Sequence, residues 1–257
     1  MIKLQVLYED NHLIAVFKPA GVLSQGDKTG DVSMYDMVKD YIRIKKGKTP
    51  LLGNARPVVN AKRSTNGVFL GLLHRLDRPV SGIMLFAKTS KGASRLSEQF
   101  RDHQVEKIYH AIVLGKPDLP AQTGKNRGVI FTKLQKIKNT SILRSIEVFN
   151  GKEVKLFYEV VKSNDKYSLL KIQIDTGKFH QIRSQLSVAG FPILGDVKYK
   201  GEIWEDSKAI ALCATNLSFK TATGDPPLPV RQKANGVGAR KMISLKIDLP
   251  REWERYI

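Results

Sequence analysis

Residues 72–89 read LLHRLDRPVSGIMLFAKT and contain the two features that decide the fold. The second half holds a continuous apolar run at residues 83–87, bounded by Gly82 and Lys88, which is typical of a strand buried on both faces. The first half is a charged segment that leads directly into this strand. Because functional side chains concentrate on loops that a rigid scaffold holds in place, this segment is the first candidate for a functional site.

Asp77 lies in the charged segment, with Arg75 and Arg78 close to it on either side. Two neighbouring cations favour the ionised, acceptor-only form of a carboxyl group. An ionised carboxylate among cations can be a nucleophile, a general base or half of a structural ion pair, since ion-pair networks also surround carboxylates with cations. The residues around Asp77 leave these three roles open.

The composition indicates a folded, strongly basic protein. The chain has 257 residues, of which 42% are hydrophobic, so it can bury a sizeable core. Its formal net charge of +19, from 43 Lys and Arg against 24 Asp and Glu, favours a polyanionic partner such as nucleic acid. No basic amphipathic helix with bulky aromatic residues stands out, so a membrane surface is the weaker choice. The alternative is a basic protein whose surface charge is merely solvated.

The cysteine and histidine content and the N-terminal residues indicate whether to expect a disulfide, a targeting segment or a metal site. Cys213 is the only cysteine, which excludes an intramolecular disulfide and fits a reducing, cytoplasmic compartment. The N-terminal residues MIKLQV are interrupted by charge, so we expect neither a signal peptide nor a membrane span. The five histidines, at positions 12, 74, 103, 110 and 180, show no metal-ligand spacing with one another or with Cys213, and we expect no metal site.

Periodicity predicts many strands and few helices. Helices are expected at residues 32–46, at 90–103 with Ser90 as N-cap, and at 179–189. Strands are expected at 12–18, 83–87, 106–114, 154–161, 167–174, 210–219 and 242–247, with a hairpin at 128–143. Loops are expected at 50–67, 117–127 and 221–240, and the first and last of them are basic.

Sequential strands joined by short turns favour an α+β fold, a mostly antiparallel mixed β-sheet with flanking helices. No repeat or low-complexity linker divides the chain, so a single domain over residues 1–257 is expected. In the strand at 106–114, Tyr109 shares one face with Lys107 and Ala111. We expect that face to border a cleft and the opposite face, with Ile108 and His110, to pack in the core.

The motif at residues 74–82, HRLDRPVSG, resembles the catalytic signature of the RluA-type pseudouridine synthases. Three further stretches resemble motifs of that family in the same order: YED and VFKPAG at 8–10 and 16–21, KIYHA at 107–111, and TGKFHQIR at 176–183 followed by Pro192, Gly195 and Asp196. The resemblance spans most of the chain. It implies the pseudouridine synthase catalytic fold, an active-site cleft across the sheet, and an isomerase that uses no cofactor.

The resemblance also implies roles for individual residues. Asp77 matches the essential aspartate, Tyr109 the tyrosine that stacks on the target base and takes part in proton removal, and Arg183 the basic residue that pairs with the aspartate. If these residues have no catalytic role, the alternatives are that Tyr109 is a half-buried strand tyrosine and that Arg183 is a surface arginine. The residues expected around the RNA are Arg75, His74, Arg78, Lys107, Lys178, Gln181 and Ile182. Of these, Arg75 is expected to fill the space left by the flipped base, and His74 to satisfy a backbone group.

The third motif departs from the family pattern, which usually reads Thr-Gly-Arg-Thr-His-Gln. Here Lys178 keeps a positive charge without the planar guanidinium fork, and Phe179 removes a natural helix N-cap. Ser184 and Gln185 replace the usual apolar residue and histidine. These differences concern contacts with RNA rather than the residues assigned to catalysis.

We therefore expect an RNA pseudouridine synthase that acts on a flipped-out uridine of tRNA or rRNA. It is expected to be a cytoplasmic monomer without metal or membrane attachment, and without a separate N-terminal RNA-binding domain, since the catalytic pattern begins at the first residues. The alternative is a non-catalytic basic RNA-binding or RNA-chaperone protein, against which the combination of Asp77, Tyr109 and Arg183 argues. A kinase catalytic loop is excluded because Leu76 separates Arg75 from Asp77. A two-carboxylate glycosidase lacks a second acid near Asp77.

Overall fold

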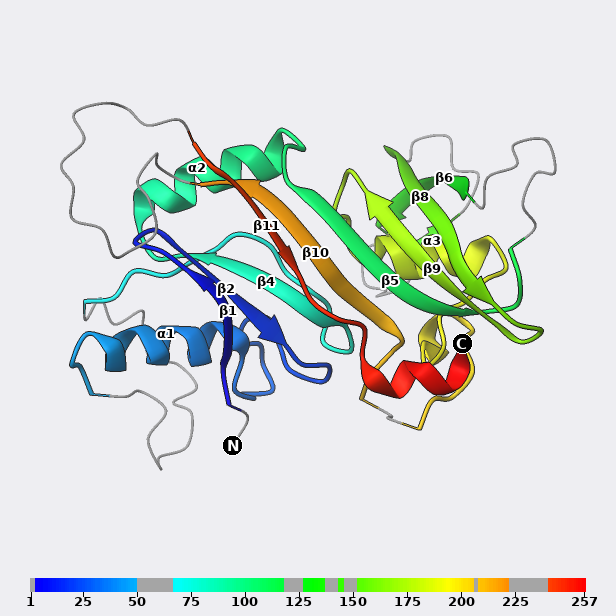
Figure 1. Ribbon diagram of the computed structural model, residues 1–257, viewed down its shortest axis with the longest axis horizontal. Helices are drawn as coiled ribbons and strands as arrows, with labels where there is room; N and C mark the ends of the chain where they lie inside the picture. Colours follow the sequence, from blue (N-terminus) through cyan, green and yellow to red (C-terminus); the bar gives the residue numbers. More distant parts are fainter. Residues whose placement is uncertain are drawn as a thin grey trace. The chain divides into compact units, whose positions relative to one another are not determined.

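The computed structural model describes residues 3–49, 67–117, 127–136, 143–145, 152–205, 208–221 and 240–257. The chain divides into two compact units. Unit 1 consists of Met1–Val105 and Ser218–Leu245, and unit 2 of Glu106–Leu217 and Lys246–Ile257. Both units combine a mostly antiparallel sheet with a small number of helices, which confirms the α+β class (Figure 1).

Unit 1 is built on β4 (Ser81–Ala87). The strands β2 (Leu13–Lys18) and β3 (Gly71–Leu72) pair antiparallel with β4, and β1 (Gln5–Glu9) pairs with β2. Residues 83–87 are at most 1% exposed, so the predicted strand with two buried faces is confirmed. The register places Lys18 opposite Gly82, which brings the end of β2 beside the charged segment that precedes β4.

Two helices of unit 1 begin at side-chain caps. The helix α1 (Met34–Lys45) starts with a capping box, in which the backbone N–H groups of Asp36 and Ser33 donate to each other's side chains at 3.3 and 3.1 Å. The helix α2 (Ser90–Arg101) is capped by Thr89, whose Oγ1 accepts from the backbone N–H of Gly92 at 3.1 Å. The prediction of Ser90 as N-cap was therefore wrong by one residue, because Thr89 already has the extended backbone that a cap requires.

Unit 2 contains a second antiparallel series of strands. β5 (Glu106–Leu114) pairs with β9 (Tyr167–Ile174), β9 with β8 (Lys152–Ser163), β8 with β6 (Arg127–Lys136), and β6 with β7 (Leu143–Ser145). The first part of β10 (Leu212–Lys220), which belongs to unit 2, lies beside β5. The end of β10 belongs to unit 1, as does β11 (Met242–Lys246) except for Lys246, and β11 pairs with β10. The helix α3 (Gln181–Val188) and the short 3₁₀ helices η1 (Val197–Tyr199) and η2 (Arg251–Tyr256) complete the described elements of this unit.

The prediction that the face of β5 with Ile108 and His110 packs in the core was wrong, and the prediction that the face with Tyr109 borders a cleft stays a prediction. The face with Lys107 and Tyr109 is buried, at 8% and 9% exposure, whereas Ile108 and His110 on the opposite face are only half-buried. The register aligns Tyr109 with Ile172 of β9, and Ile172 with Tyr158 of β8, and all three side chains are buried. Tyr109 therefore belongs to the packed face of the strand.

Several predicted loops fall wholly or mostly outside the described residues. These are 50–67, of which only Gly67 is described, 117–127, and 221–240. The predicted hairpin at 128–143 is borne out by the antiparallel pairing of β6 with β7. No helix among the described residues is long and apolar enough to cross a membrane.

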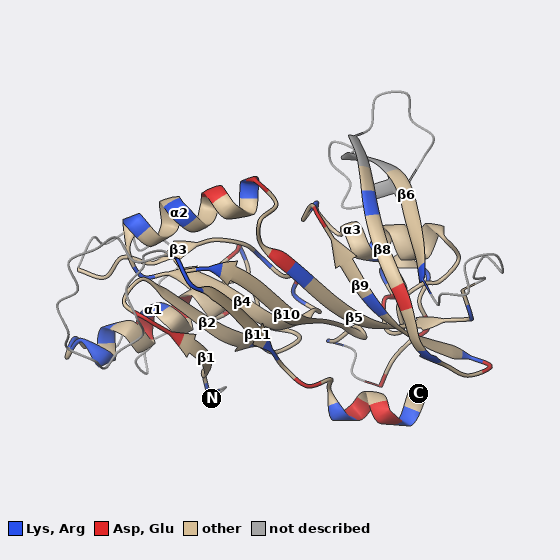
Figure 2. Ribbon diagram, turned by 45° about the horizontal axis from the view of Figure 1, so that its top comes forward, with Lys and Arg blue, Asp and Glu red and all other residues tan. Residues whose placement is uncertain are grey.

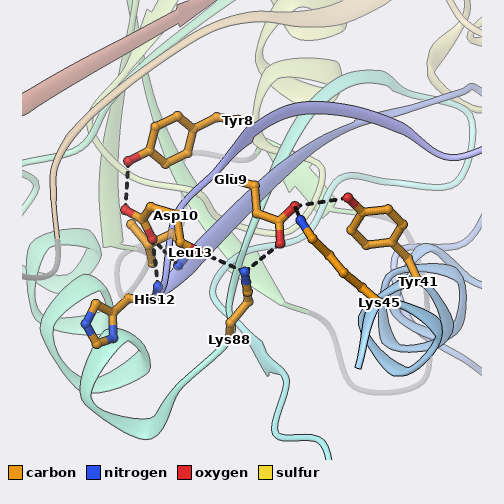
Figure 3. Close-up of polar contacts among 8 residues, drawn as sticks. All are labelled: Tyr8, Glu9, Asp10, His12, Leu13, Tyr41, Lys45 and Lys88. Carbon is orange, nitrogen blue, oxygen red and sulfur yellow. Dashed lines mark hydrogen bonds and ion pairs between the residues drawn. The ribbon is translucent and has the colours of Figure 1, made fainter. Parts of the chain in front are cut away.

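Glu9, the last residue of β1, connects three elements of unit 1 (Figure 3). Its Oε2 accepts from the Tyr41 hydroxyl at 3.0 Å and from Lys45 Nζ at 2.8 Å, both on α1. Its Oε1 accepts from Nζ of Lys88, the residue after β4, at 2.6 Å. Burial by itself would raise the pKa of Glu9, but the hydrogen bonds from Lys45, Lys88 and Tyr41 outweigh it and lower the pKa. The carboxylate is therefore a stabilising part of the fold.

We expect Glu9→Gln to lower the free energy of unfolding by about 1–3 kcal/mol at neutral pH, because it removes charge-assisted hydrogen bonds from a shielded site. Since folding lowers the pKa of Glu9, its contribution is present above the ordinary value of 4.5 and is lost as the pH falls through the folded-state pKa. Urea unfolding of both proteins between neutral and acidic pH measures this difference.

The matched control is Glu159→Gln on β8. The ion pair of Glu159 with Arg127 is solvent-exposed and should contribute less than about 1 kcal/mol. A Glu9→Gln variant as stable as the wild type at neutral pH would contradict the role assigned to Glu9.

Candidate active site

The backbone on both sides of Asp77 is held by other residues of unit 1. Ser24 Oγ donates to the carbonyl oxygen of Leu76 at 2.5 Å and accepts from its N–H at 3.1 Å. The N–H of Gly21 donates to the carbonyl oxygen of Arg78 at 2.8 Å. Asp77 is half-buried between these two fixed points.

Lys18 lies fully buried beside this segment, at the end of β2. Its Nζ donates to the carbonyl oxygens of Pro19 and Arg78 at 3.0 Å and of Val80 at 2.6 Å. Three acceptors match the three N–H donors of an ammonium group. Burial nevertheless lowers the pKa of Lys18 to about 7; the negative charge of Asp77 opposes this shift and Arg78 adds to it. Lys18 is thus a buried amine whose protonated form the negative charge of Asp77 favours. The sequence analysis predicted no role for Lys18.

The two arginines beside Asp77 are both exposed. Arg78 Nη2 forms an ion pair with Asp31 at 2.7 Å, and its Nε donates to the carbonyl oxygen of Gly21 at 2.9 Å. The side chain of Arg75 is exposed. The guanidinium group of Arg78 is therefore engaged by Asp31, and the role of Arg78 toward RNA stays a prediction.

His74 has the structural role expected of it. Its Nε2 accepts from the backbone N–H of Leu85 at 3.0 Å, which places the proton of a neutral ring on Nδ1. The ring also stacks on Phe100 of α2, with 5.1 Å between the ring centres. His74 therefore fixes the charged segment to β4 and α2.

Arg183, in the first turn of α3, is buried and forms a bidentate ion pair with Asp196. The distances are 2.7 Å from Nε to Oδ2 and 2.8 Å from Nη2 to Oδ1, and the two residues are only 5% and 1% exposed. Arg183 Nη1 lies 3.2 Å from His180 Nε2, and the guanidinium carbon lies 5.1 Å from the ring centre of Tyr199. The alternative of a surface arginine is excluded.

The backbone around Asp196 explains how its carboxylate is placed. The N–H of Asp196 donates to the carbonyl oxygen of Ile193 at 3.0 Å, and its carbonyl oxygen accepts from the N–H groups of Tyr199 and Gly201 at 2.9 Å each. A Cβ atom on Gly201 would collide with the carbonyl oxygen of Ile193. The turn therefore requires glycine at position 201. Asp196 was quoted in a predicted motif, but its pairing with Arg183 was missed.

The side chain of Gln181 holds the turn before α3. Its Oε1 accepts from Thr176 Oγ1 at 2.6 Å and from the N–H of Lys178 at 3.1 Å, while its Nε2 donates to the carbonyl oxygen of Lys155 at 3.2 Å. Ile182 is buried at 5% exposure. Both residues thus shape the interior of unit 2, and their role toward RNA stays a prediction.

The two lysines predicted to lie near RNA have different environments. Lys107 is buried, and its Nζ donates to the carbonyl oxygen of Asp175 at 3.1 Å. Burial lowers the pKa of Lys107, opposed by the negative charge of Asp175. Lys178 is exposed.

Each unit contains part of the predicted set of residues. Asp77 is associated with Lys18 in unit 1, and Arg183 with His180, Asp196 and Tyr199 in unit 2. Among the described residues, no group of three or more His, Cys, Asp or Glu side chains could hold a metal ion. Lys and Arg are spread over α1, α2, β5 and β8 with acidic residues between them (Figure 2).

Solved structures share this fold. The human protein RNA Pseudouridylate Synthase Domain Containing 4 matches with a TM-score of 0.67 at 23% identity, covering 98% of this chain and 91% of that protein. The human protein RNA Pseudouridylate Synthase Domain Containing 1 matches with a TM-score of 0.59 at 18% identity, covering 99% and 94%. The fold is therefore that of the pseudouridylate synthases.

Sequence comparisons define the family. Residues 12–188 match the model of RNA pseudouridylate synthase, an interval that includes Lys18, Asp77, Tyr109 and Arg183. Ribosomal large subunit pseudouridine synthase C of Rickettsia conorii is 33% identical over 215 residues, 82% of this chain and 62% of the relative. tRNA pseudouridine synthase C of Haemophilus ducreyi is 33% identical over 205 residues, 77% and 74%. The chain belongs to the RNA pseudouridylate synthase family, and it spans about three-fifths of the length of the Rickettsia relative.

We expect Lys18→Met to leave the carbonyl oxygens of Pro19, Arg78 and Val80 without their donor and to lower the free energy of unfolding by about 2–4 kcal/mol. Because folding lowers the pKa of Lys18 from 10.5 to about 7, the unfolded chain binds more protons between these values. The titration of Lys18 should therefore make the wild type more stable as the pH rises from about 7 to 10.5.

Urea unfolding across this pH range measures the effect. Lys28→Met, at an exposed lysine of the same unit, is the matched control and should keep the wild-type pH dependence. If Lys18→Met and wild type show the same stability and the same slope with pH, Lys18 is not the buried cation described here.

Proposed function

We propose that the chain is an RNA pseudouridine synthase that isomerises specific uridines of structured tRNA or rRNA. The observation that carries the proposal is Asp77, held on a fixed backbone beside buried Lys18, within the interval that matches the family. The names of the relatives, which refer to the ribosomal large subunit and to tRNA, support both classes of RNA. No observation favours a non-catalytic RNA-binding protein.

Asp77 supplies the reactive carboxylate. The reaction breaks the bond between the ribose carbon C1′ and uracil N1, rotates the base, and joins C1′ to C5. One bond is broken and one is made within the same nucleotide, and the proton lost from C5 is balanced by one gained at N1. No electrons are gained or lost, so the proposed enzyme needs no metal or redox cofactor. A carboxylate on a fixed backbone meets the need for a positioned group that forms or steadies the intermediate.

Tyr109 stacks on the target uracil and takes part in removing the proton from C5. The motif KIYHA, which lies inside the interval that matches the family, supports this role. The uridine must leave its helical stack to reach such a site, and Arg75, which is exposed, fills the space it leaves.

Arg183 orients the carboxylate of Asp77 through an ion pair, and Asp196 acts as the positioning residue for Arg183. Asp196 binds the Nε and Nη2 edge of the guanidinium group. The end of the fork formed by Nη1 and Nη2 therefore points away from Asp196, and that end is suited to a second carboxylate.

The proposal also covers the domain organisation, the compartment and the overall charge of the protein. The two units form one catalytic domain over residues 1–257, which acts as a cytoplasmic monomer. The single cysteine supports a reducing compartment, and the net charge of +19 supports binding to RNA phosphates.

We expect Asp77→Asn to reduce pseudouridine formation by at least about 1,000-fold, because the amide keeps the shape of the side chain but lacks the reactive carboxylate. The measurement is pseudouridine mapping in tRNA and rRNA from cells that lack the protein, after incubation with purified wild type or variant. Asp165→Asn, at an exposed aspartate of the β8–β9 turn, is the control and should retain full activity. Product formation by Asp77→Asn near the wild-type rate would refute the assignment.

A further inference from the structure

Phe179 is an exposed aromatic side chain at the entrance to α3. It is 51% exposed, although Gln181 and Arg183, which follow shortly after it in the chain, are buried. Because the ring is half exposed, filling the core does not account for it, and its role must lie in what it contacts.

The ring of Phe179 is held parallel to the ring of His180. The ring centres are 3.8 Å apart and the planes differ by 15°. Successive side chains of an extended chain point to opposite sides, so two consecutive rings stack only if the backbone turns between them. His180 provides this turn, because it has a left-handed backbone with φ of 51°, which is uncommon for a residue other than glycine.

His180 is fixed from its other sides. Its Nδ1 lies 2.9 Å from the Tyr199 hydroxyl, and its Nε2 lies 3.2 Å from Arg183 Nη1. The Tyr199 ring meets it edge-on, with 5.6 Å between the ring centres and 76° between the planes. One face of Phe179 therefore rests on a rigid support. Since half of the residue is exposed, its outer face is the part that solvent reaches.

The chain around this stack is basic. Lys178 precedes Phe179, and Lys198 and Lys200 flank Tyr199; all three lysines are exposed. A flat apolar surface together with nearby ammonium groups matches the chemistry of a nucleotide, whose base stacks while its phosphates attract cations. A lipid or protein partner would require a larger apolar patch than a single ring.

We propose that Phe179, supported by His180, is a stacking subsite for a base of the RNA substrate other than the isomerised uridine. The proposal rests on the proposed function, because the ring belongs to the same helix entrance as Arg183. The subsite takes any base with an open face, and the neighbouring lysines bind its flanking phosphates.

Fluorescence anisotropy measures the binding of short RNA probes to the purified chain. The probes are an oligoadenylate, which contains no uridine to isomerise, and an abasic ribose-phosphate oligomer of the same length and charge. Stacking on one ring is expected to make Phe179→Ala and Phe179→Thr bind oligoadenylate about 5- to 150-fold more weakly than the wild type. Binding of the abasic oligomer should be unchanged, and Phe179→Trp should keep the wild-type affinity for both probes.

Phe131→Ala is the matched control, since Phe131 of β6 is 58% exposed and belongs to the same unit. It should bind both probes like the wild type. If Phe179→Ala binds oligoadenylate as tightly as the wild type, or loses affinity equally for both probes, the subsite is refuted. Because these assays need no turnover, absence of pseudouridine formation by the wild type would overturn the proposed function without changing the outcome for Phe179.

Discussion

The buried ion pair between Arg183 and Asp196 is the constraint on which the candidate site of unit 2 depends. Removing two charges from water is costly and is tolerated only where the geometry and the remaining hydrogen bonds are good. Both conditions are met, because the pair is bidentate and the backbone of Asp196 is held by Tyr199 and Gly201. The guanidinium group then fixes His180, and His180 supports the exposed ring of Phe179.

Unit 1 also uses a buried cation to fix a functional segment, with a different partner. The ammonium group of Lys18 is bound by three backbone carbonyl oxygens, which are dipoles and do not neutralise its charge. Burial lowers its pKa to about 7, and the negative charge of Asp77 opposes this fall. The negative charge of Asp77 thus favours the protonated form of the buried Lys18 in the same unit.

Local patterns predicted the fold well, because apolar runs and periodicity report burial directly. The strand at 83–87 and the helix that became α1 follow from such patterns, and the bond from Leu85 to His74 agrees with the expected structural histidine. Contacts between residues distant in sequence were not predictable in this way. The partner of Arg78 is Asp31, and the motif VFKPAG gave no sign that Lys18 would bind the segment around Asp77. For β5, both faces carry apolar residues, so alternation alone could not show that Tyr109 is on the packed face.

The placement of Arg183 by Asp196 is tested most directly by single-turnover pseudouridine formation with Asp196→Asn and Asp196→Glu, with urea unfolding to establish that each variant is folded under the assay conditions. An amide keeps the shape of the carboxylate but not its charge, so Asp196→Asn should be slower by about 100- to 1,000-fold with RNA affinity unchanged. Asp196→Glu, which keeps the carboxylate, should recover part of the rate. A folded Asp196→Asn variant that reacts within about twofold of the wild type would contradict the dependence of the site on this ion pair.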